Sequence, residues 1–401
     1  MRILILSPNW PFPADNGGKL RAASVARYLA QHHETAFVCF SDEGERLAHY
    51  PEAAQFQDLQ AIAPLAQGSL LRRWLSPVPA GPPDHNNPTM TRCVETMIAR
   101  FSPDVLLAGD PLLTPYIAPY TDRVRILDYI CVDTLQFERL QALSPIPMRL
   151  LWMLRRLKFV AYLRRITRHY DLCLVNSEED RTALLEAAST WRHIEFLPNG
   201  LDLTAYPVGL ATPQPKTLIF PGSLIYPPNR DAASYFIREV LPHIRDQVPD
   251  VTLLITGKVP EDGSAPQAPG VVYTGYVPDV RPVIAGAWVC PVPLRAGAGG
   301  ARFKVLEALA LGTPIVSTAI GAEGVHVTDG VNILMAETPQ EFAAQTVKLL
   351  QSPELRAHLA TAGRRLIEER YNWRVLGARV AALADNFLSQ RRTDARAATT
   401  L

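Results

Sequence analysis

The sequence predicts an α/β protein made of two doubly wound, parallel-sheet domains that face a cleft. Short apolar runs alternate with helical segments along the chain, which is the pattern of parallel sheets. The alternation stops at a proline-rich stretch, YPVGLATPQPK (206–216), and then begins again. The chain has 401 residues, more than one ordinary core holds. We therefore expect an N-terminal domain over 1–205, a C-terminal domain over 206–374, and a final helix (375–401) that packs on either one.

The expected elements follow in order along each half. RILILS (2–7) is an apolar run ended by Pro8, so it is expected to be a buried strand, and LRAASVARYLAQ (20–31) has the apolar spacing of a helix. Further strands of the first half are expected at 35–40, 104–109, 123–129, 171–177 and 193–200. Those of the second half are expected at 217–223, 251–257, 271–275, 287–294 and 314–318. Ligands of such sheets bind beyond the carboxyl ends of the strands.

Composition excludes several classes of protein. With 40 basic and 39 acidic residues, no overall charge attracts nucleic acid. The 5 cysteines are scattered singly, which argues against a disulfide framework or a zinc site and fits a reducing compartment. The first apolar run is too short for a signal peptide, and no stretch approaches the roughly 20 apolar residues of a membrane span. We expect a cytoplasmic protein without a metal or other cofactor, because no D-x-D string and no paired Cys or His ligands occur.

One stretch carries most of the functional signal, RAGAGGARFKVLEALALGTPIVST (295–318). Gly299 and Gly300 lie between an expected strand and an expected helix, where glycine lets a ligand approach the backbone. The N-terminus of the following helix is a natural anion site. Arg302 and Lys304 add positive charge suited to phosphate. The residues therefore favour a phosphate site.

Glu307 completes this pattern, because a carboxylate does not bind phosphate but accepts hydrogen bonds from a sugar diol. Phosphate together with a diol indicates a nucleotide. The alternative is that Lys304 and Glu307 form only an i, i+3 surface ion pair and that the glycines form only a tight turn. A second glycine pair, Gly17 and Gly18, precedes the first expected helix, so both halves carry a glycine-rich loop between strand and helix; Asn16-Gly17 is alternatively an ordinary turn.

These residues resemble a known family. FKVLEALALGTPIVSTAIGAEGV (303–325), GYVPDV (275–280) and LPNGLD (197–202) are similar to the C-terminal half of family 4 glycosyltransferases, and the phrasing is closest to bacterial exopolysaccharide-type sugar transferases. The resemblance covers most of 200–375, and GGKLRAA (17–23) is its main anchor in the first half. It implies the GT-B fold, two Rossmann-like domains, and transfer of a sugar from a nucleotide-sugar with retention of anomeric configuration.

The resemblance also implies roles for individual residues of the donor site. Glu307 matches the second glutamate of the family's E-x7-E motif, which holds the nucleotide ribose, whereas the first glutamate falls at Gly299. Backbone N–H groups of 299–301 are expected to substitute for the missing acid. Ser223 stands where relatives often have Arg, so Arg302 and Lys304 are expected to bind the diphosphate and act in catalysis. The full expected donor set is Gly17, Gly18, Gly222, Ser223, Val277, Gly299, Gly300, Arg302, Lys304 and Glu307, with Val277 near the base.

The expected acceptor site lies in the first half. Relatives place a histidine at the end of an N-domain strand, and here RILDYICVD (125–133) offers Asp128, which we expect to face the cleft as a catalytic and acceptor-binding residue. Asp133 is a second acceptor-binding candidate. The alternatives are that Asp128 caps the following turn and that Asp133 is a helix N-cap.

The sequence therefore predicts a retaining, metal-independent glycosyltransferase that uses a UDP-, GDP- or ADP-linked donor and a glycan, lipid-linked or small-molecule acceptor. The alternatives are a nucleotide-sugar epimerase and a non-catalytic nucleotide-sugar-binding protein of the same fold. MRLLWMLRRLKFVAYLRRITRHY (148–170) has seven Arg/Lys and no acid, which suggests a peripheral contact with the inner face of the membrane. On a helical wheel its cations fall nearly all round, which favours instead a packed helix with snorkelling arginines or one facing an anionic acceptor.

Overall fold

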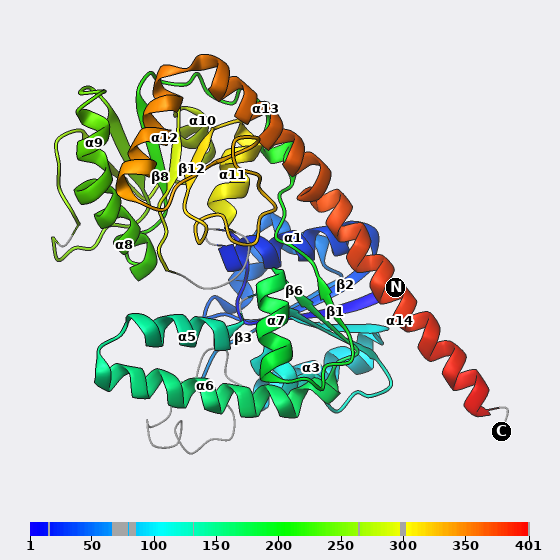
Figure 1. Cartoon of the computed structure of the whole chain (residues 1–401). Coiled ribbons are helices and arrows are strands. Elements are labelled where there is room, and N and C mark those ends of the chain that lie inside the picture. The colour runs from blue at the N-terminus through cyan, green and yellow to red at the C-terminus, as the bar shows by residue number, and fades with distance from the viewer. Residues whose placement is uncertain are drawn as a thin grey trace. The chain divides into compact units, whose positions relative to one another are not determined.

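The computed structural model describes residues 1–14, 17–65, 79, 86–130, 132–263, 265–296 and 302–399. The described chain divides into two compact units. We call residues 1–198 together with 374–399 the N-terminal unit, and residues 199–296 together with 302–373 the C-terminal unit. The change of unit at 198/199 lies before the expected boundary at 205/206. Figure 1 labels the elements of both units.

The N-terminal unit is built on a parallel sheet of seven strands in the order β3-β2-β1-β4-β5-β6-β7. This strand order and the parallel pairing of the strands are typical of a doubly wound sheet. The inner strands are buried almost throughout, because each is an apolar run covered on both faces. The strands are β1 (Arg2–Ser7), β2 (Glu34–Phe40), β3 (Asp58–Ile62), β4 (Val105–Ala108), β5 (Val124–Tyr129), β6 (Leu172–Val175) and β7 (Ile194–Phe196).

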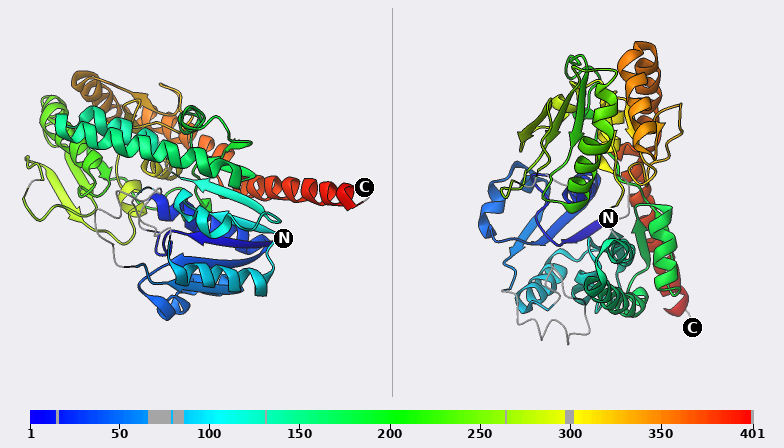
Figure 2. Two further views of the ribbon diagram at one scale, coloured as in Figure 1. Left: turned by 90° about the horizontal axis from the view of Figure 1, so that it is seen from below. Right: turned by 60° about the vertical axis from the view of Figure 1, so that its left-hand side comes forward.

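Helices connect these strands, and α5 and α6 run side by side (Figure 1). The last helix, α14, belongs to this unit and is the red helix that ends at the C-terminus in Figure 2. Its Arg379 pairs with Glu195 of β7 at 3.0 Å, and its Arg391 pairs with Asp171 at 2.7 Å. The α-helices of the unit are α1 (Gly17–His32), α3 (Pro88–Phe101), α4 (Thr114–Ile117), α5 (Asp133–Leu143), α6 (Ile146–Ile166), α7 (Glu178–Ala187) and α14 (Trp373–Thr399). Trp373 itself belongs to the C-terminal unit.

The C-terminal unit contains two parallel three-stranded sheets, β10-β9-β8 and β11-β12-β13. A parallel bridge between Leu218 and Val289 links β8 to the segment that leads into β11, so the two sheets continue one another. The strands are β8 (Thr217–Pro221), β9 (Thr252–Thr256), β10 (Val271–Gly275), β11 (Cys290–Val292), β12 (Ile315–Ser317) and β13 (Leu334–Met335). The α-helices are α8 (Pro227–Tyr235), α9 (Leu241–Arg245), α10 (Arg281–Ala285), α11 (Phe303–Leu311), α12 (Pro339–Gln351) and α13 (Pro353–Arg370).

The predicted fold class is confirmed, because both units are α/β with parallel sheets. Every expected strand is present within a few residues of its predicted ends, while β3 and β13 were not predicted. In the part of the chain that the structure describes, no helix is both long enough and apolar enough to span a bilayer.

Candidate nucleotide-type site in the C-terminal unit

Helix α11 positions two of the predicted site residues, Lys304 and Glu307. They are three residues apart and so lie on one side of the helix. The opposite side is in the core, where Val305 and Leu306 have no exposed surface. The helix ends at Gly312, whose φ of 74° is the left-handed conformation that glycine supplies at a helix terminus. Core packing and the helix C-cap at Gly312 therefore hold Lys304 and Glu307 in the first two turns of α11.

Lys304 is held beside the end of β8. Its Nζ donates a hydrogen bond of 2.9 Å to Oδ1 of Asn229 on α8 and lies 4.3 Å from the centre of the Phe220 ring. Burial lowers the pKa of Lys304 to about 8. Within the described residues Lys304 makes this contact with Asn229 and no ion pair with Glu307, so the surface-pair alternative is wrong. A partly buried ammonium group gains from an added anion.

Gly222 makes room for this contact. Its φ is +152°, and a Cβ there would lie 2.7 Å from Nδ2 of Asn229 and 3.2 Å from Nζ of Lys304. The Gly222 N–H already donates to the carbonyl of Thr256 at 3.3 Å, and the Ser223 carbonyl accepts from Asn229 at 3.0 Å. Gly222 and Ser223 therefore border Lys304, and their contact with a donor stays a prediction.

Glu307 is paired with a tyrosine that sequence reasoning did not select. The Tyr206 hydroxyl donates to Oε1 of Glu307 at 2.9 Å. Burial raises the pKa of Glu307 to about 7, and the Tyr206 hydrogen bond opposes that rise. Arg281 lies beside the pair, with its guanidinium carbon 5.7 Å from the centre of the Tyr206 ring. Arg281 also forms an ion pair with Asp279 at 2.7 Å. Val277 precedes Asp279 and Arg281 in the chain, and its predicted contact with the base stays a prediction.

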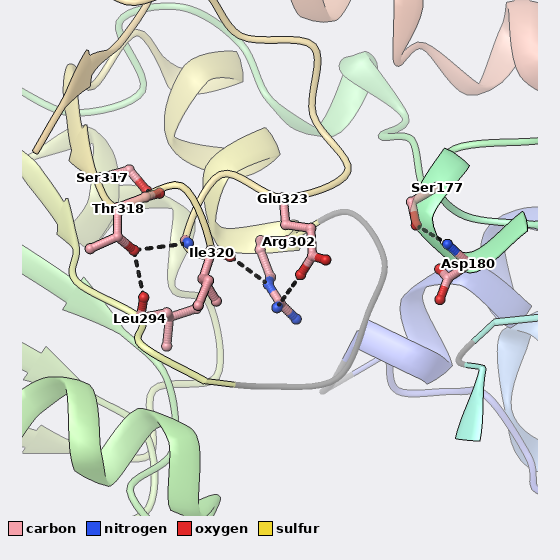
Figure 3. A network of polar contacts seen from close by, with 9 residues as sticks. Ser177, Asp180, Leu294, Arg302, Ser317, Thr318, Ile320 and Glu323 are labelled. Atoms are coloured by element: carbon pink, nitrogen blue, oxygen red, sulfur yellow. Dashed lines mark hydrogen bonds and ion pairs between the residues drawn. The ribbon is translucent and has the colours of Figure 1, made fainter. Parts of the chain in front are cut away.

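Arg302 has a carboxylate partner. Its Nη2 lies 3.1 Å from Oε2 of Glu323, and the two side chains are only 12% and 9% exposed (Figure 3). The turn that carries Glu323 is held by Thr318, whose hydroxyl accepts from the Gly321 N–H at 3.0 Å and donates to the carbonyl of Leu294 (Figure 3). Arg302 is thus fixed by an acid that the sequence pattern did not reveal. Its predicted contact with a diphosphate stays a prediction.

Two of the predicted donor-binding residues, Gly299 and Gly300, lie outside the described residues. In the N-terminal unit Gly17 and Gly18 are the first two residues of α1, so they lie within the helix and not in the loop that was expected before it. Their contact with a donor stays a prediction. Asn16, on which the turn alternative depends, also lies outside the described residues. Within the described chain, no group of three or more His, Cys, Asp or Glu is placed to hold a metal ion.

Asp128 has a buried partner that sequence reasoning did not select. Its carboxylate accepts from Nη2 of Arg21 at 2.6 Å and from Nε at 3.0 Å, and Arg21 also donates to the carbonyl of Leu197 at 2.8 Å. Arg21 is 0% exposed and Asp128 is 2% exposed. Asp128 is thus the counter-charge of a buried guanidinium, and the expectation that it faces a cleft stays a prediction. The turn-cap alternative fails, since Asp128 lies within β5. Its catalytic and acceptor-binding roles stay predictions.

Asp133 is the first residue of α5, and Val132 is the N-cap, so the N-cap alternative for Asp133 is wrong. Its carboxylate accepts from the Tyr129 hydroxyl at 2.9 Å. Burial raises the pKa of Asp133 to about 6.

Asp110 follows the neighbouring strand β4. Its pKa is raised to about 8, first by burial and then by the charge of Asp133. Sequence reasoning missed Asp110, although it follows an apolar strand beside the one that leads to Asp133.

The C-terminal unit matches a known family. Residues 215–352 match the family model described as glycosyl transferases group 1. Residues 215–352 are a group 1 glycosyltransferase domain. This glycosyltransferase domain contains Lys304, Glu307, Arg302 and Glu323, and Tyr206 reaches it from just outside.

About half of the chain also matches curated relatives. It is 29% identical to the phosphatidyl-myo-inositol mannosyltransferase of Mycobacterium leprae over 196 residues, which is 46% of this chain and 51% of the relative. It is 29% identical to the GDP-mannose-dependent alpha-(1-6)-phosphatidylinositol monomannoside mannosyltransferase of Mycolicibacterium smegmatis over 251 residues, 55% of this chain and 64% of the relative. The chain thus spans about half to two thirds of the curated relatives it matches.

A solved structure confirms the GT-B fold. The HepE protein of Anabaena, solved in complex with UDP, has a TM-score of 0.68 and 16% identity over 96% of this chain and 100% of that chain. HepE was also solved with UDP-glucose. At this level of identity the likeness shows the fold alone.

Proposed function

We propose that the protein transfers a sugar from a nucleotide-sugar donor to a hydroxyl group of a glycan, lipid-linked or small-molecule acceptor. The observation that carries the proposal is the placement of Lys304 and Glu307 on one side of α11 within the group 1 domain. One is a partly buried cation and the other a partly buried acid, so a diphosphate and a ribose diol would satisfy both. The names of the relatives support this chemistry, since one is a GDP-mannose-dependent mannosyltransferase and HepE was solved with UDP-glucose.

Lys304 would act on the leaving group. Its pKa of about 8 means that the free protein holds this ammonium at some cost in free energy. Negative charge that grows on the diphosphate as the glycosidic bond breaks would stabilise the ammonium, and the ammonium would stabilise that charge in return. Asn229 fixes Nζ through the 2.9 Å hydrogen bond, so little reorganisation is needed during the reaction.

Glu307 would bind the ribose. When ionised, it accepts hydrogen bonds from hydroxyl groups, and Tyr206 favours the ionised form by donating to Oε1. We further propose retention of anomeric configuration, from the family resemblance, and no requirement for a metal, because the sequence has no D-x-D string and no paired Cys or His ligands. A lipid-linked acceptor is favoured among the three by the phosphatidylinositol mannosyltransferases among the relatives.

The test is a transfer assay with purified protein, a panel of UDP-, GDP- and ADP-sugars, and lipid extract as the acceptor source. We expect release of one nucleoside diphosphate together with a new glycoside whose anomeric configuration matches the donor, unchanged by EDTA. Conversion of the donor sugar without acceptor would indicate the epimerase. Binding of a nucleotide-sugar without any product would indicate the non-catalytic alternative.

A further inference from the structure

The sheet of the N-terminal unit has a topological switch point between β1 and β4. From β1 the chain continues to β2 and β3 on one side, and β4, β5, β6 and β7 follow in order on the other. In doubly wound sheets, ligands bind beyond the carboxyl ends of the strands at such a point. Asp110 lies two residues after the end of β4, and the N–H of Gly109 donates to the carbonyl of Leu6 in β1 at 2.9 Å. Asp110 is therefore placed where this type of sheet binds a ligand.

A backbone contact holds the Asp110 side chain in place. Asp110 is the N-cap of the short 3₁₀ helix Pro111–Leu113, and its Oδ1 accepts from the N–H of Leu112 at 2.7 Å. Within the described residues this side chain makes no other hydrogen bond and no ion pair. Asp110 is half-buried, so it is not sealed off from solvent. Its second oxygen, Oδ2, is therefore available to a ligand.

A second carboxyl group is near enough to act on Asp110. Burial and then the charge of Asp133 raise the pKa of Asp110 to about 8, and burial raises the pKa of Asp133 to about 6. Asp133 accepts from the Tyr129 hydroxyl at 2.9 Å and, in the part of the chain that the structure describes, forms no ion pair. Asp128, by contrast, is neutralised by Arg21. The Asp110–Asp133 pair thus lacks a counter-charge of this kind and holds about one proton at neutral pH.

The neighbouring strand β6 ends in a third polar group. Asn176 follows β6 directly and is 1% exposed. Its Nδ2 donates to the carbonyl of Ile130, a contact that sets the orientation of the amide. Its Oδ1 is buried and has no hydrogen-bond partner among the described residues, which costs free energy unless a ligand donates to it. The carboxyl ends of β4, β5 and β6 thus carry more hydrogen-bond acceptors than the protein itself satisfies.

We propose that Asp110 is an acceptor-binding residue that holds the reacting hydroxyl of the acceptor, with Asp133 beside it. A hydroxyl both donates and accepts a hydrogen bond, so it fits a carboxyl pair that shares a proton. A phosphate group offers mainly acceptor oxygens, and its charge is repelled by the charge of the pair. The end of the acceptor that reacts is therefore a neutral polyol, a sugar or a cyclitol, even where the remainder is a lipid. This inference rests on the proposed function and adds to it a residue and a chemical class.

The test compares transfer with donor binding in the full chain. Asp110→Ser keeps an oxygen that can accept from the Leu112 N–H, so its unfolding temperature should stay near that of the wild type. The variant loses Oδ2, so kcat/KM for the acceptor in lipid extract should fall at least about tenfold, mainly through KM. Its calorimetric affinity for the nucleotide-sugar should not change, because the donor site lies in the C-terminal unit.

Asp202→Ser is the matched control. Asp202 is likewise the N-cap of a short 3₁₀ helix, Leu203–Ala205, and its Oδ1 accepts from the N–H of Thr204 at 3.1 Å. This variant makes the same chemical change in the same local structure, and it should transfer sugar like the wild type. A loss of transfer that is equal in the two variants would show that Asp110 acts only as a helix cap.

Competition at saturating donor tests the chemical class. Myo-inositol and methyl α-mannoside, a cyclitol and a sugar, should compete with the lipid extract for the wild type and should compete less well for Asp110→Ser. Inorganic phosphate should not compete. Competition by phosphate in place of the two polyols would overturn the class of acceptor.

The failure of this inference differs from the failure of the proposed function. If the wild type transfers sugar and Asp110→Ser does so equally well, only the role of Asp110 is contradicted. If Asp110→Ser loses affinity for the nucleotide-sugar in parallel with transfer, Asp110 is not specific to the acceptor. A wild type that forms no product with any donor contradicts the proposed function, and this inference with it.

Discussion

The Tyr206 hydroxyl donates a 2.9 Å hydrogen bond to Oε1 of Glu307, joining residues 101 positions apart in the sequence. This contact connects the chain just before the group 1 domain to helix α11 at the centre of it. Because the bond stabilises the ionised carboxylate, it opposes the rise in pKa that burial causes at Glu307. Tyr206 is therefore a positioning residue for the acid that is expected to bind ribose.

Tyr206→Phe should weaken nucleotide binding roughly ten- to a hundredfold at pH 7, since hydrogen bonds to charged groups contribute about 1.5–3 kcal/mol and the pKa of Glu307 would rise further. The loss should shrink at pH 9, where Glu307 is ionised in both proteins. Isothermal titration calorimetry at the two pH values measures it. Tyr273→Phe is the control, because the Tyr273 hydroxyl donates to the carbonyl of Pro266 in the same unit. An equal loss at both pH values would contradict the positioning role.

Lys304→Met should weaken binding of a nucleoside diphosphate at least about tenfold and leave binding of the nucleoside nearly unchanged. The wild type should also bind the diphosphate more weakly as the pH rises from 7 to 9, because the ammonium, with a pKa of about 8, loses its proton over this range. The variant should lack that decline. Lys216→Met is the control, since Lys216 pairs with Asp250 at the surface. A wild-type affinity that does not change from pH 7 to 9 would show that Lys304 is not a phosphate ligand.

Glu323→Gln tests whether Arg302 is available to the diphosphate. Neutralising the acid 3.1 Å from Arg302 would leave an uncompensated cation, so affinity for the diphosphate should rise several-fold while the free energy of unfolding falls by about 1–3 kcal/mol. Calorimetry and urea unfolding measure the two effects. Asp231→Asn is the control, because its pair with Arg295 is 47% and 44% exposed. Lower stability with unchanged affinity would make the Arg302–Glu323 pair structural only.

Asp128→Asn should lower the free energy of unfolding by about 3–5 kcal/mol, because it leaves the fully buried Arg21 without its counter-charge. Urea unfolding measures this loss, and Glu34→Gln serves as the matched surface change, since the Arg2–Glu34 pair is 42% and 54% exposed. Activity per folded molecule should fall little if Asp128 is a structural residue. A large fall in kcat with normal stability would restore the catalytic role predicted from sequence.

The fold was largely predictable from sequence, because apolar runs of strand length record which segments are buried. The edge strand β3, DLQAI, was missed because it alternates polar residues and is only partly buried. Strand β13 has two residues and leaves no pattern at all. Both errors lie at the edges of sheets, where burial constrains the sequence least.

The candidate site was predictable only in part. Lys304 and Glu307 were found because glycines, cations and an acid occur together in one short stretch. Their partners could not be found, since Asn229 and Tyr206 are 75 and 101 residues away and pairing leaves no local periodicity. The partner of Asp128 could not be found for the same reason, since Arg21 is 107 residues earlier.

The central claim is that α11 presents a nucleotide-sugar site, and calorimetry with wild type and Glu307→Ala tests it most directly. Titration with UDP-, GDP- and ADP-sugars should reveal one donor that binds the wild type and binds Glu307→Ala at least about tenfold more weakly. Both proteins should unfold at similar temperatures. A donor that binds the two proteins equally, or the absence of binding by any of the donors, would contradict the account.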